Sequence, residues 1–319
     1  MHNYTSKFSS QITDMINFKT SMGYKERSYI ALQDFDRFCA ERYPEEEHLT
    51  EEIVSAWGTL KDTERVNGLK KRLIAVRQFG KYLNFRGIHA YVLPTELIGS
   101  YEPFYPYIFT DEELQAFFKA ADSVPPDKRS PFSEYTIPTL FRLLYSCGLR
   151  PNEVRDLRKC DVNVKENSIF ILDSKGRKDR IISITEEVSQ LCKKYDTLAE
   201  FSYPNRELFF KIPACINGRT VWIENQLHLC WKMAEISSFP DKHPRVYDFR
   251  HNYATRIMMR WMEEGENVMS LLPFLSAYMG HASFSSTAYY IHLLPERLIH
   301  NKSFDWSRFE KLIPEVTTE

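Results

Sequence analysis

The chain has 319 residues, enough for two domains of ordinary size. Hydrophobic residues make up 43% and aromatic residues 14% of the sequence, so it can build a sizeable core and wholesale disorder is excluded. The 42 lysines and arginines nearly balance the 43 aspartates and glutamates. A net charge of −1 argues against binding to nucleic acid through bulk charge, although local clusters of charge can still bind it.

Local composition excludes several other classes of protein. No window holds eighteen consecutive apolar residues, so the sequence predicts no transmembrane helix, and its start lacks the apolar run of a signal peptide. The cysteines are scattered without a C-x-x-C pair, which favours reduced and mostly buried thiols over disulfides or a zinc site. We therefore expect a cytoplasmic protein with no membrane partner. The cysteines are Cys39, Cys147, Cys160, Cys192, Cys215 and Cys230.

Residues 1–93 carry the apolar periodicity of four short helices. Apolar residues recur at helical spacing from Phe8 to Ile16, before a helix-ending glycine at Gly23, and a second stripe covers residues 29–38. Thr50 is placed to cap a third helix, because two glutamates follow it in the first turn. The fourth helix shows one apolar face, made of Val66, Leu69, Leu73, Val76 and Leu83. Helices with one apolar face must pack together, which predicts a small helical domain.

The periodicity breaks at residues 94–108, where three prolines and a glycine predict a linker. A second domain, predicted over 109–300, opens with a capping box that runs from Thr110 to Glu113. Strand-like runs at 168–172 and 180–184 flank the polar loop 174–179 and predict a hairpin. Helices are predicted around it at 134–146, 185–196, 220–235, 247–263 and 268–279. The expected fold class is therefore mainly α with a small β-sheet (α+β), followed by a tail at 301–319.

Four clusters in the second domain carry residues suited to chemistry. Each cluster has an ordinary structural explanation when it is taken alone, such as a surface arginine, a solvated lysine on a hairpin tip, a buried ion pair or a core tyrosine. The clusters are residues 147–154 with Arg150, the hairpin tip with Lys175, residues 244–251 with Tyr247 and Arg250, and residues 280–292 with His281 and Tyr290.

Together these residue types suit phosphoryl transfer from DNA to a protein hydroxyl without a metal. Arginine forks bind nonbridging phosphate oxygens and offset the charge that grows in the transition state. A tyrosine hydroxyl can attack phosphorus and hold the bond as a phosphotyrosine ester. A lysine whose pKa is lowered by neighbouring cations can protonate the departing sugar oxygen.

The sequence resembles the tyrosine recombinase (phage integrase) family over about residues 8–300. Four motifs in order carry the resemblance: residues 148–153, residues 174–180, residues 247–251, and the pair Gly280 and His281 followed nine positions later by Tyr290. The resemblance implies an N-terminal helical core-binding domain over 1–93 and a C-terminal mixed catalytic domain over 109–300, which grip duplex DNA from opposite sides.

The resemblance also implies roles for individual residues. Arg150 and Arg250 correspond to the two arginines that hold the scissile phosphate. Lys175 corresponds to the hairpin lysine that acts as general acid for the 5′-oxygen, and His281 to the histidine that orients the phosphate and the nucleophile. Tyr290 corresponds to the nucleophile that becomes joined to the DNA 3′-phosphate. No cofactor and no metal are implied.

Three further positions are supporting or depart from the family pattern. Glu153 matches an acidic position that supports the active site, and His251 is expected to be structural rather than chemical. The family usually has H-x-x-R where this sequence has Tyr247 and Arg250. A phenol with an unperturbed pKa near 10 suits proton exchange at neutral pH poorly, so we expect Tyr247 to position other groups. The enzyme is expected to remain active.

A cluster of basic residues between positions 61 and 86 is expected to contact DNA phosphates. Such contacts give affinity and salt dependence without sequence specificity. The structural alternative is a solvated helix surface. Glutamates at 41–52 offset this cluster, which explains the near-zero net charge. The DNA-binding residues expected here and in the hairpin are Arg65, Lys70, Lys71, Arg72, Arg77, Lys81, Arg177 and Lys178.

The leading functional interpretation is a site-specific DNA recombinase of a mobile element, an integrase or transposase. The resemblance implies double-stranded DNA with specific recombination sites as partner, a monomer in solution and a homo-tetramer on DNA, in the bacterial cytoplasm and at the nucleoid when bound. The tail 301–319 either packs on its own domain or is exchanged between protomers. A Xer-type resolvase, a type IB topoisomerase and a noncatalytic DNA-binding regulator stay open as alternatives.

Overall fold

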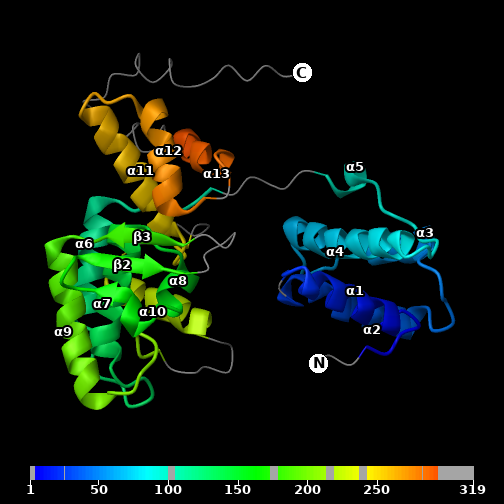
Figure 1. Ribbon diagram of the computed structural model, residues 1–319, viewed down its shortest axis with the longest axis horizontal. Helices are drawn as coiled ribbons and strands as arrows, with labels where there is room; N and C mark the ends of the chain where they lie inside the picture. Colours follow the sequence, from blue (N-terminus) through cyan, green and yellow to red (C-terminus); the bar gives the residue numbers. More distant parts are fainter. Residues whose placement is uncertain are drawn as a thin grey trace. The chain divides into compact units, whose positions relative to one another are not determined.

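The computed structural model describes residues 4–24, 26–99, 105–172, 179–212, 219–236, 243–281 and 283–293 (Figure 1). The chain divides into two compact units, Met1–Phe104 and Tyr105–Glu319. Both units are mainly helical, and one small sheet lies in the second, so the expected fold class is confirmed. Across the described ranges, no helix is long and apolar enough to span a membrane.

The first unit is a helical bundle with an aromatic centre. Phe35 is fully buried and its ring lies 5.3 Å from that of Trp57 and 6.4 Å from those of Phe8 and Phe79. The side chain of Thr50 accepts a hydrogen bond from the amide of Ile53, as expected for a helix cap. The four expected helices are confirmed, with a short 3-10 turn and a one-turn helix in addition. They are α1 (Ser9–Ser21), η1 (Glu26–Tyr29), α2 (Ala31–Arg42), α3 (Glu51–Trp57), α4 (Val66–Phe85) and α5 (Thr95–Ile98).

The beginning of the expected linker belongs to the packed part of the first unit. Ile98 of α5 and the preceding Leu93 are buried in its core. Arg77 of α4 holds this segment, because its Nε donates to the carbonyl of Leu93 and its Nη2 to Oγ1 of Thr95, both at 2.8 Å. The part of the proline- and glycine-containing segment around residues 93–98 therefore packs on the first unit.

The second unit contains a three-stranded antiparallel sheet with the order β1-β2-β3. Ile169 of β2 pairs with Ile182 of β3 and both are buried, whereas their neighbour Ile181 is 69% exposed. This alternation is the pattern of a sheet with one face on the core, and the expected strand pairing is confirmed. The elements are α6 (Asp111–Asp122), α7 (Ser133–Cys147), α8 (Pro151–Arg155), η2 (Lys159–Asp161), β1 (Val162–Asn163), β2 (Ser168–Ile171), β3 (Arg180–Ser183), α9 (Glu186–Ser202), α10 (Arg219–Met233), α11 (Asp248–Glu263), α12 (Val268–Met279), α13 (Ser285–Ala288) and η3 (Tyr289–Leu293).

Two apolar clusters meet along α11. Phe249, near its start, belongs to the main core with α6, α7, α9, α10 and the sheet. Met258, farther along, belongs to a smaller core with Leu272 and Leu275 of α12 and Tyr290 of η3. Figure 1 shows α11, α12 and α13 together at one end of this unit. The smaller core therefore fixes the segment that carries Tyr290 against α11.

Candidate active site

Two helix-ending glycines shape the backbone where the arginines of the second unit converge. Gly148 ends α7 with a φ of 58°, and a Cβ there would lie 2.5 Å from Cδ1 of Tyr253, so only glycine fits. Gly280 ends α12 with a φ of 62°. Two residues after the first glycine, Arg150 is the N-cap of α8 and Pro151 occupies its first turn.

Arg250, in the first turn of α11, is fully buried and links the ends of α7 and α12. Its Nη1 donates to the carbonyl of Gly148 at 2.6 Å, and its Nη2 donates to the carbonyl of Met279. Burial lowers the pKa of this guanidinium, and so does the charge of Arg150. Both carbonyl partners are neutral, so these bonds orient the guanidinium without neutralising its charge.

Arg150 is 9% exposed and is held from three sides. Its Nη2 donates to the carbonyl of Gly280 at 2.6 Å, and its Nη1 donates to Oε1 of Glu153 at 2.7 Å. Its backbone amide donates to Oε2 of Glu153 at 2.8 Å. Two guanidinium groups that lie so close and so deep repel each other, and a bound anion relieves that repulsion. Their forked donors suit a phosphate group.

Glu153, predicted to be a supporting residue, is shared between two arginines. Besides its bonds to Arg150, its carboxylate accepts Nη1 and Nη2 of Arg180 at 2.9 and 2.8 Å. The side chains of Glu153 and Arg180 are only 6% and 8% exposed. The sequence motif 174–180 includes Arg180 but assigns no role to it, since arginines in a polar, basic segment usually face solvent.

Tyr290 lies in η3 with 2% of its surface exposed, on the same side of α11 as Arg250 and His251. Its ring centroid is 5.5 Å from that of His251 and 6.0 Å from that of His281. Burial raises the pKa of Tyr290 to about 12, although the charges of Arg250 and Arg150 act in the opposite direction. The phenol is therefore protonated at neutral pH and lies within the field of both arginines.

His281 follows Gly280 directly and is oriented by a buried hydroxyl. Its Nδ1 lies 2.7 Å from Oγ1 of Thr287, which is fully buried. Its ring stacks against that of Tyr290, with an angle of 22° between the planes. The short α13 thus supplies both the hydroxyl that orients His281 and the connection to Tyr290. Sequence reasoning gave no role to Thr287, because a threonine in a run of serines carries no distinguishing pattern.

Tyr247 and His251 lie one turn apart at the start of α11, with ring centroids 5.1 Å apart. Tyr247 is 37% exposed, whereas His251 is buried. Burial lowers the pKa of His251 to about 3, helped by the charges of Arg245, Arg250 and His281. His251 is therefore neutral at pH 7. Lys175, Arg177 and Lys178 lie outside the described residues.

The predicted DNA-binding residues of the first unit differ in their exposure. Arg65, Lys71 and Lys81 are exposed, and Lys70 and Arg77 are half-buried. Arg72 is buried, and this corrects the prediction made for it. All three of its nitrogens donate to groups of the first unit, so Arg72 is removed from the expected contacts.

The partners of Arg72 all belong to the first unit. Its Nε and Nη2 donate to the carboxylate of Glu64 at 2.9 and 2.7 Å, and its other bonds go to the carbonyls of Trp57 and Thr59. Its guanidinium also lies over the Trp57 ring, 4.4 Å from the centroid. The helical spacing of the sequence does not distinguish the buried Arg72 from the exposed Lys71 beside it.

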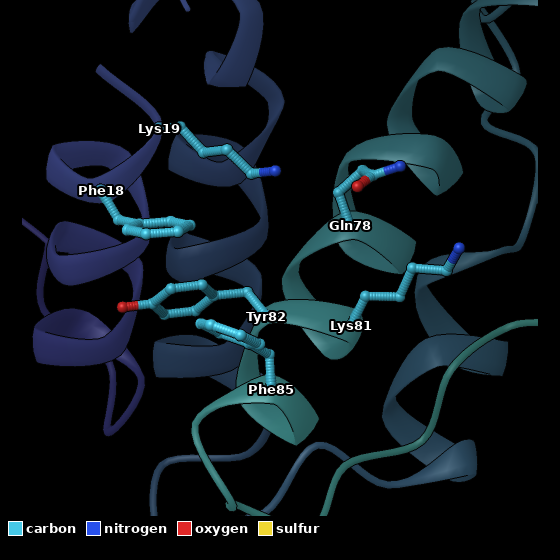
Figure 2. A pocket seen from close by; sticks show the side chains of 6 residues that line it. All are labelled: Phe18, Lys19, Gln78, Lys81, Tyr82 and Phe85. Atoms are coloured by element: carbon cyan, nitrogen blue, oxygen red, sulfur yellow. The ribbon is translucent and has the colours of Figure 1, made fainter. Parts of the chain in front are cut away.

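Lys81 borders a groove between α1 and α4 with a volume of about 280 Å³ (Figure 2). Phe18 lies 5.8 Å from Tyr82 and 5.9 Å from Phe85, measured between ring centroids, and Phe85 is 72% exposed. Lys19 and Gln78 complete the lining. The basic surface of the first unit therefore adjoins exposed aromatic rings.

Within the described ranges, no group of three or more histidine, cysteine, aspartate or glutamate side chains is placed to hold a metal ion. The chemistry carried by the described residues is that of two buried arginines, a carboxylate shared with a third, a neutral histidine, an oriented histidine and a buried phenol. Such a set of groups can bind an anion and place a hydroxyl beside it.

Known proteins similar to this chain in sequence or in fold include integrases and recombinases. The chain is 26% identical over 307 residues to an integrase/recombinase of Sinorhizobium fredii, which covers 91% of this chain and 94% of that protein. Its fold is similar to that of the Tn1549 transposon integrase in complex with transposon right end DNA, with a TM-score of 0.64, 13% identity and coverage of 90% of this chain and 94% of the other. A λ integrase tetramer bound to a Holliday junction gives a TM-score of 0.60 at 13% identity, covering 88% of this chain and 76% of that one.

The model of the phage integrase family matches residues 108–297, well over half of the chain. This span contains every residue of the cluster described above. The chain belongs to the phage integrase family of tyrosine recombinases, enzymes that cleave and rejoin DNA in site-specific recombination.

Proposed function

We propose that this protein is the integrase of a mobile element and joins Tyr290 to the 3′-phosphate of specific double-stranded DNA sites. The observation that carries the proposal is the placement of Tyr290, a buried tyrosine, in the electrostatic field of two buried guanidinium groups, those of Arg150 and Arg250. A phosphodiester brought against these donors presents its phosphorus to the phenol. Similarity to an integrase/recombinase over 91% of this chain supports the mobile-element role.

Two arginines, a tyrosine and a lysine carry the proposed reaction. Arg150 and Arg250 bind the nonbridging oxygens and stabilise the charge that develops on them. Tyr290 attacks phosphorus through its oxygen, and because the free phenol is protonated at neutral pH, its proton passes to solvent water as the oxygen–phosphorus bond forms. The bond to the 5′-oxygen breaks, and the resemblance gives Lys175 the role of protonating that oxygen.

His281, Glu153 and Tyr247 position these groups. Thr287 orients the His281 ring, and His281 in turn stacks on Tyr290. Glu153 holds Arg150 through both its side chain and its backbone amide. Tyr247, exposed at the start of α11, orients the neighbouring aromatic rings rather than exchanging protons.

DNA binding and assembly complete the proposal. Exposed and half-buried basic residues of the first unit contact phosphates: Arg65, Lys70, Lys71, Arg77 and Lys81. The active assembly is a homo-tetramer on paired sites, as in the λ integrase structure bound to a Holliday junction. Action in the bacterial cytoplasm is supported by the five described cysteines, which are all free and of which four are buried.

The test is incubation of the full chain with a nicked suicide substrate that carries the DNA flanking its own gene. The nick releases a short strand after cleavage, so the covalent complex accumulates. We expect a complex that is absent in Tyr290→Phe and retained in Tyr289→Phe, the matched control at the neighbouring tyrosine. A complex that persists in Tyr290→Phe would show that another residue is the nucleophile, and failure of the wild-type chain to react with the correct ends would favour a noncatalytic regulator.

A further inference from the structure

Arg180, the first residue of β3, is the most fully bonded side chain near the active site that the proposed reaction leaves without a role. Its Nη1 and Nη2 donate to the two carboxylate oxygens of Glu153 at 2.9 and 2.8 Å. Its Nε donates to the carbonyl of Tyr278 at 2.8 Å. The side chain is 8% exposed and all three of its nitrogens are engaged with the protein. It is therefore not placed to contact DNA.

Arg180 shares one anchor with Arg150 and holds the backbone close to the other. Oε1 of Glu153 accepts one bond from each arginine, and Oε2 accepts the backbone amide of Arg150 together with Nη2 of Arg180. The other anchor of Arg150 is the carbonyl of Gly280, two residues after the Tyr278 carbonyl that Arg180 holds. The planar fork of Arg180 therefore fixes the plane of the carboxylate and the end of α12 together.

Packing at Gly280 is adapted to this arginine. A Cβ on Gly280 would lie 3.1 Å from Nη1 and 3.3 Å from Cδ of Arg180. The glycine, required already by its left-handed φ, thus also leaves the space through which Arg180 reaches Glu153.

We infer that Arg180 is a positioning residue of the recombination reaction, which acts through Glu153 and the end of α12 to set the guanidinium of Arg150 against the scissile phosphate. The inference rests on the proposed role of Arg150. Two effects follow from the geometry. First, the carboxylate of Glu153 is prevented from rotating away from Arg150. Second, its single negative charge is shared between two arginines, so the cluster of three guanidinium groups and one carboxylate keeps a net positive charge that attracts phosphate.

Without Arg180, Glu153 would pair with Arg150 alone and offset its charge. We therefore expect Arg180→Met to slow single-turnover cleavage of the nicked suicide substrate by about 100-fold, the scale of a roughly 1 Å displacement of a catalytic group. The affinity for the same DNA should change much less, because phosphate contacts elsewhere supply it. Arg180→Lys, which keeps the charge and loses the planar fork, should recover part of the rate.

Arg206→Met is the matched control. Arg206 is also buried in the second unit, with its side chain 6% exposed and paired with Asp196 and Glu200 on α9. The hydrogen-bond partners that the structure describes for Arg206 all lie outside the arginine cluster. If the loss in Arg180→Met merely reflects a lost buried ion pair, Arg206→Met should lose cleavage to the same degree. That outcome would overturn the inference.

Two further measurements separate positioning from a general loss of structure. In a Glu153→Gln background, Arg180→Met should slow single-turnover cleavage by less than about a further threefold, because both changes break the link from Arg180 through Glu153 to Arg150. On a substrate whose scissile phosphate is an uncharged methylphosphonate, the defect of Arg180→Met should shrink to below about tenfold, since less charge has to be matched. Full additivity with Glu153→Gln, or an undiminished defect on the neutral substrate, would overturn the inference. If the Met variant fails to fold, the Lys variant carries the same comparisons.

The outcomes for the inference and for the proposed function are distinguishable. Wild-type cleavage that is lost in Tyr290→Phe and unaffected in Arg180→Met would refute the role of Arg180 and leave the proposed function standing. Failure of the wild-type chain to form any covalent complex would refute both.

Discussion

Arg72→Met should destabilise the first unit strongly and should not act primarily on DNA binding. The variant keeps most of the apolar stem and removes the charge that faces Glu64, whose own side chain is only 16% exposed. It also leaves the carbonyls of Trp57 and Thr59 without their donor. Removal of one partner of a buried ion pair typically costs about 3–5 kcal/mol. We expect a loss of that size, a large part of the stability of a small domain.

The pH dependence of this stability has a definite sign. Hydrogen bonding to Arg72 is the largest cause that lowers the pKa of Glu64 below its ordinary 4.5. The contribution of Glu64 to stability is therefore fully present above the pKa of the unfolded chain and is lost as the pH falls through the lower folded pKa. In Arg72→Met this acid-dependent loss should be reduced.

The assay is urea unfolding of the full chain at several pH values, with hydrogen exchange of the α4 amides to report on the first unit separately from the second. Lys71→Met is the matched control, because it removes an exposed charge from the same helix. Lys71→Met should leave the free energy of unfolding within about 0.5 kcal/mol of wild type. It should also lower the slope of log K for DNA binding against log salt concentration by about one. An Arg72→Met variant that is as stable as wild type and shares the reduced salt slope of Lys71→Met would show that Arg72 contacts DNA after all.

Three other changes test the active site. Thr287→Val removes a fully buried hydroxyl that lies 2.7 Å from Nδ1 of His281. Loss of this hydrogen bond should raise the activation barrier by about 1.4 kcal/mol, which slows single-turnover cleavage about tenfold and leaves DNA affinity unchanged. A rate equal to wild type would refute the orienting role. Tyr247→His should cleave no more slowly than wild type, because imidazole exchanges protons more readily near neutral pH; a large loss would show that the phenol itself is needed. Because burial lowers the pKa of His251 to about 3, the second unit should lose stability as the pH falls from about 6.5 toward 3, and His251→Asn should flatten this dependence in thermal unfolding. A pH dependence that is unchanged in His251→Asn would place its origin in other groups.

Local sequence patterns already determined the elements and the order of the candidate residues. Periodic apolar positions such as Val76 on α4 and alternating ones such as Ile169 on β2 specify helices and strands, because burial of one face depends on spacing along the chain. The glycines at 148 and 280 mark helix ends for an equally local reason, since a left-handed φ favours glycine. The family motifs follow the same order, which is why the class of enzyme is readable from the sequence.

Only the tertiary structure decided which charges act on which groups. Arg72 and Lys71 are neighbours on one basic helix, yet one is buried against Glu64 and the other is exposed. Arg180 reaches Glu153 from 27 positions away, and Thr287 meets His281 only because α13 folds back beside it. Burial and pairing depend on what packs against a side chain from distant segments, and no periodicity along the chain records that. The sequence alone therefore identifies the arginines and the tyrosine expected to carry the chemistry, whereas tertiary packing determines which groups orient them.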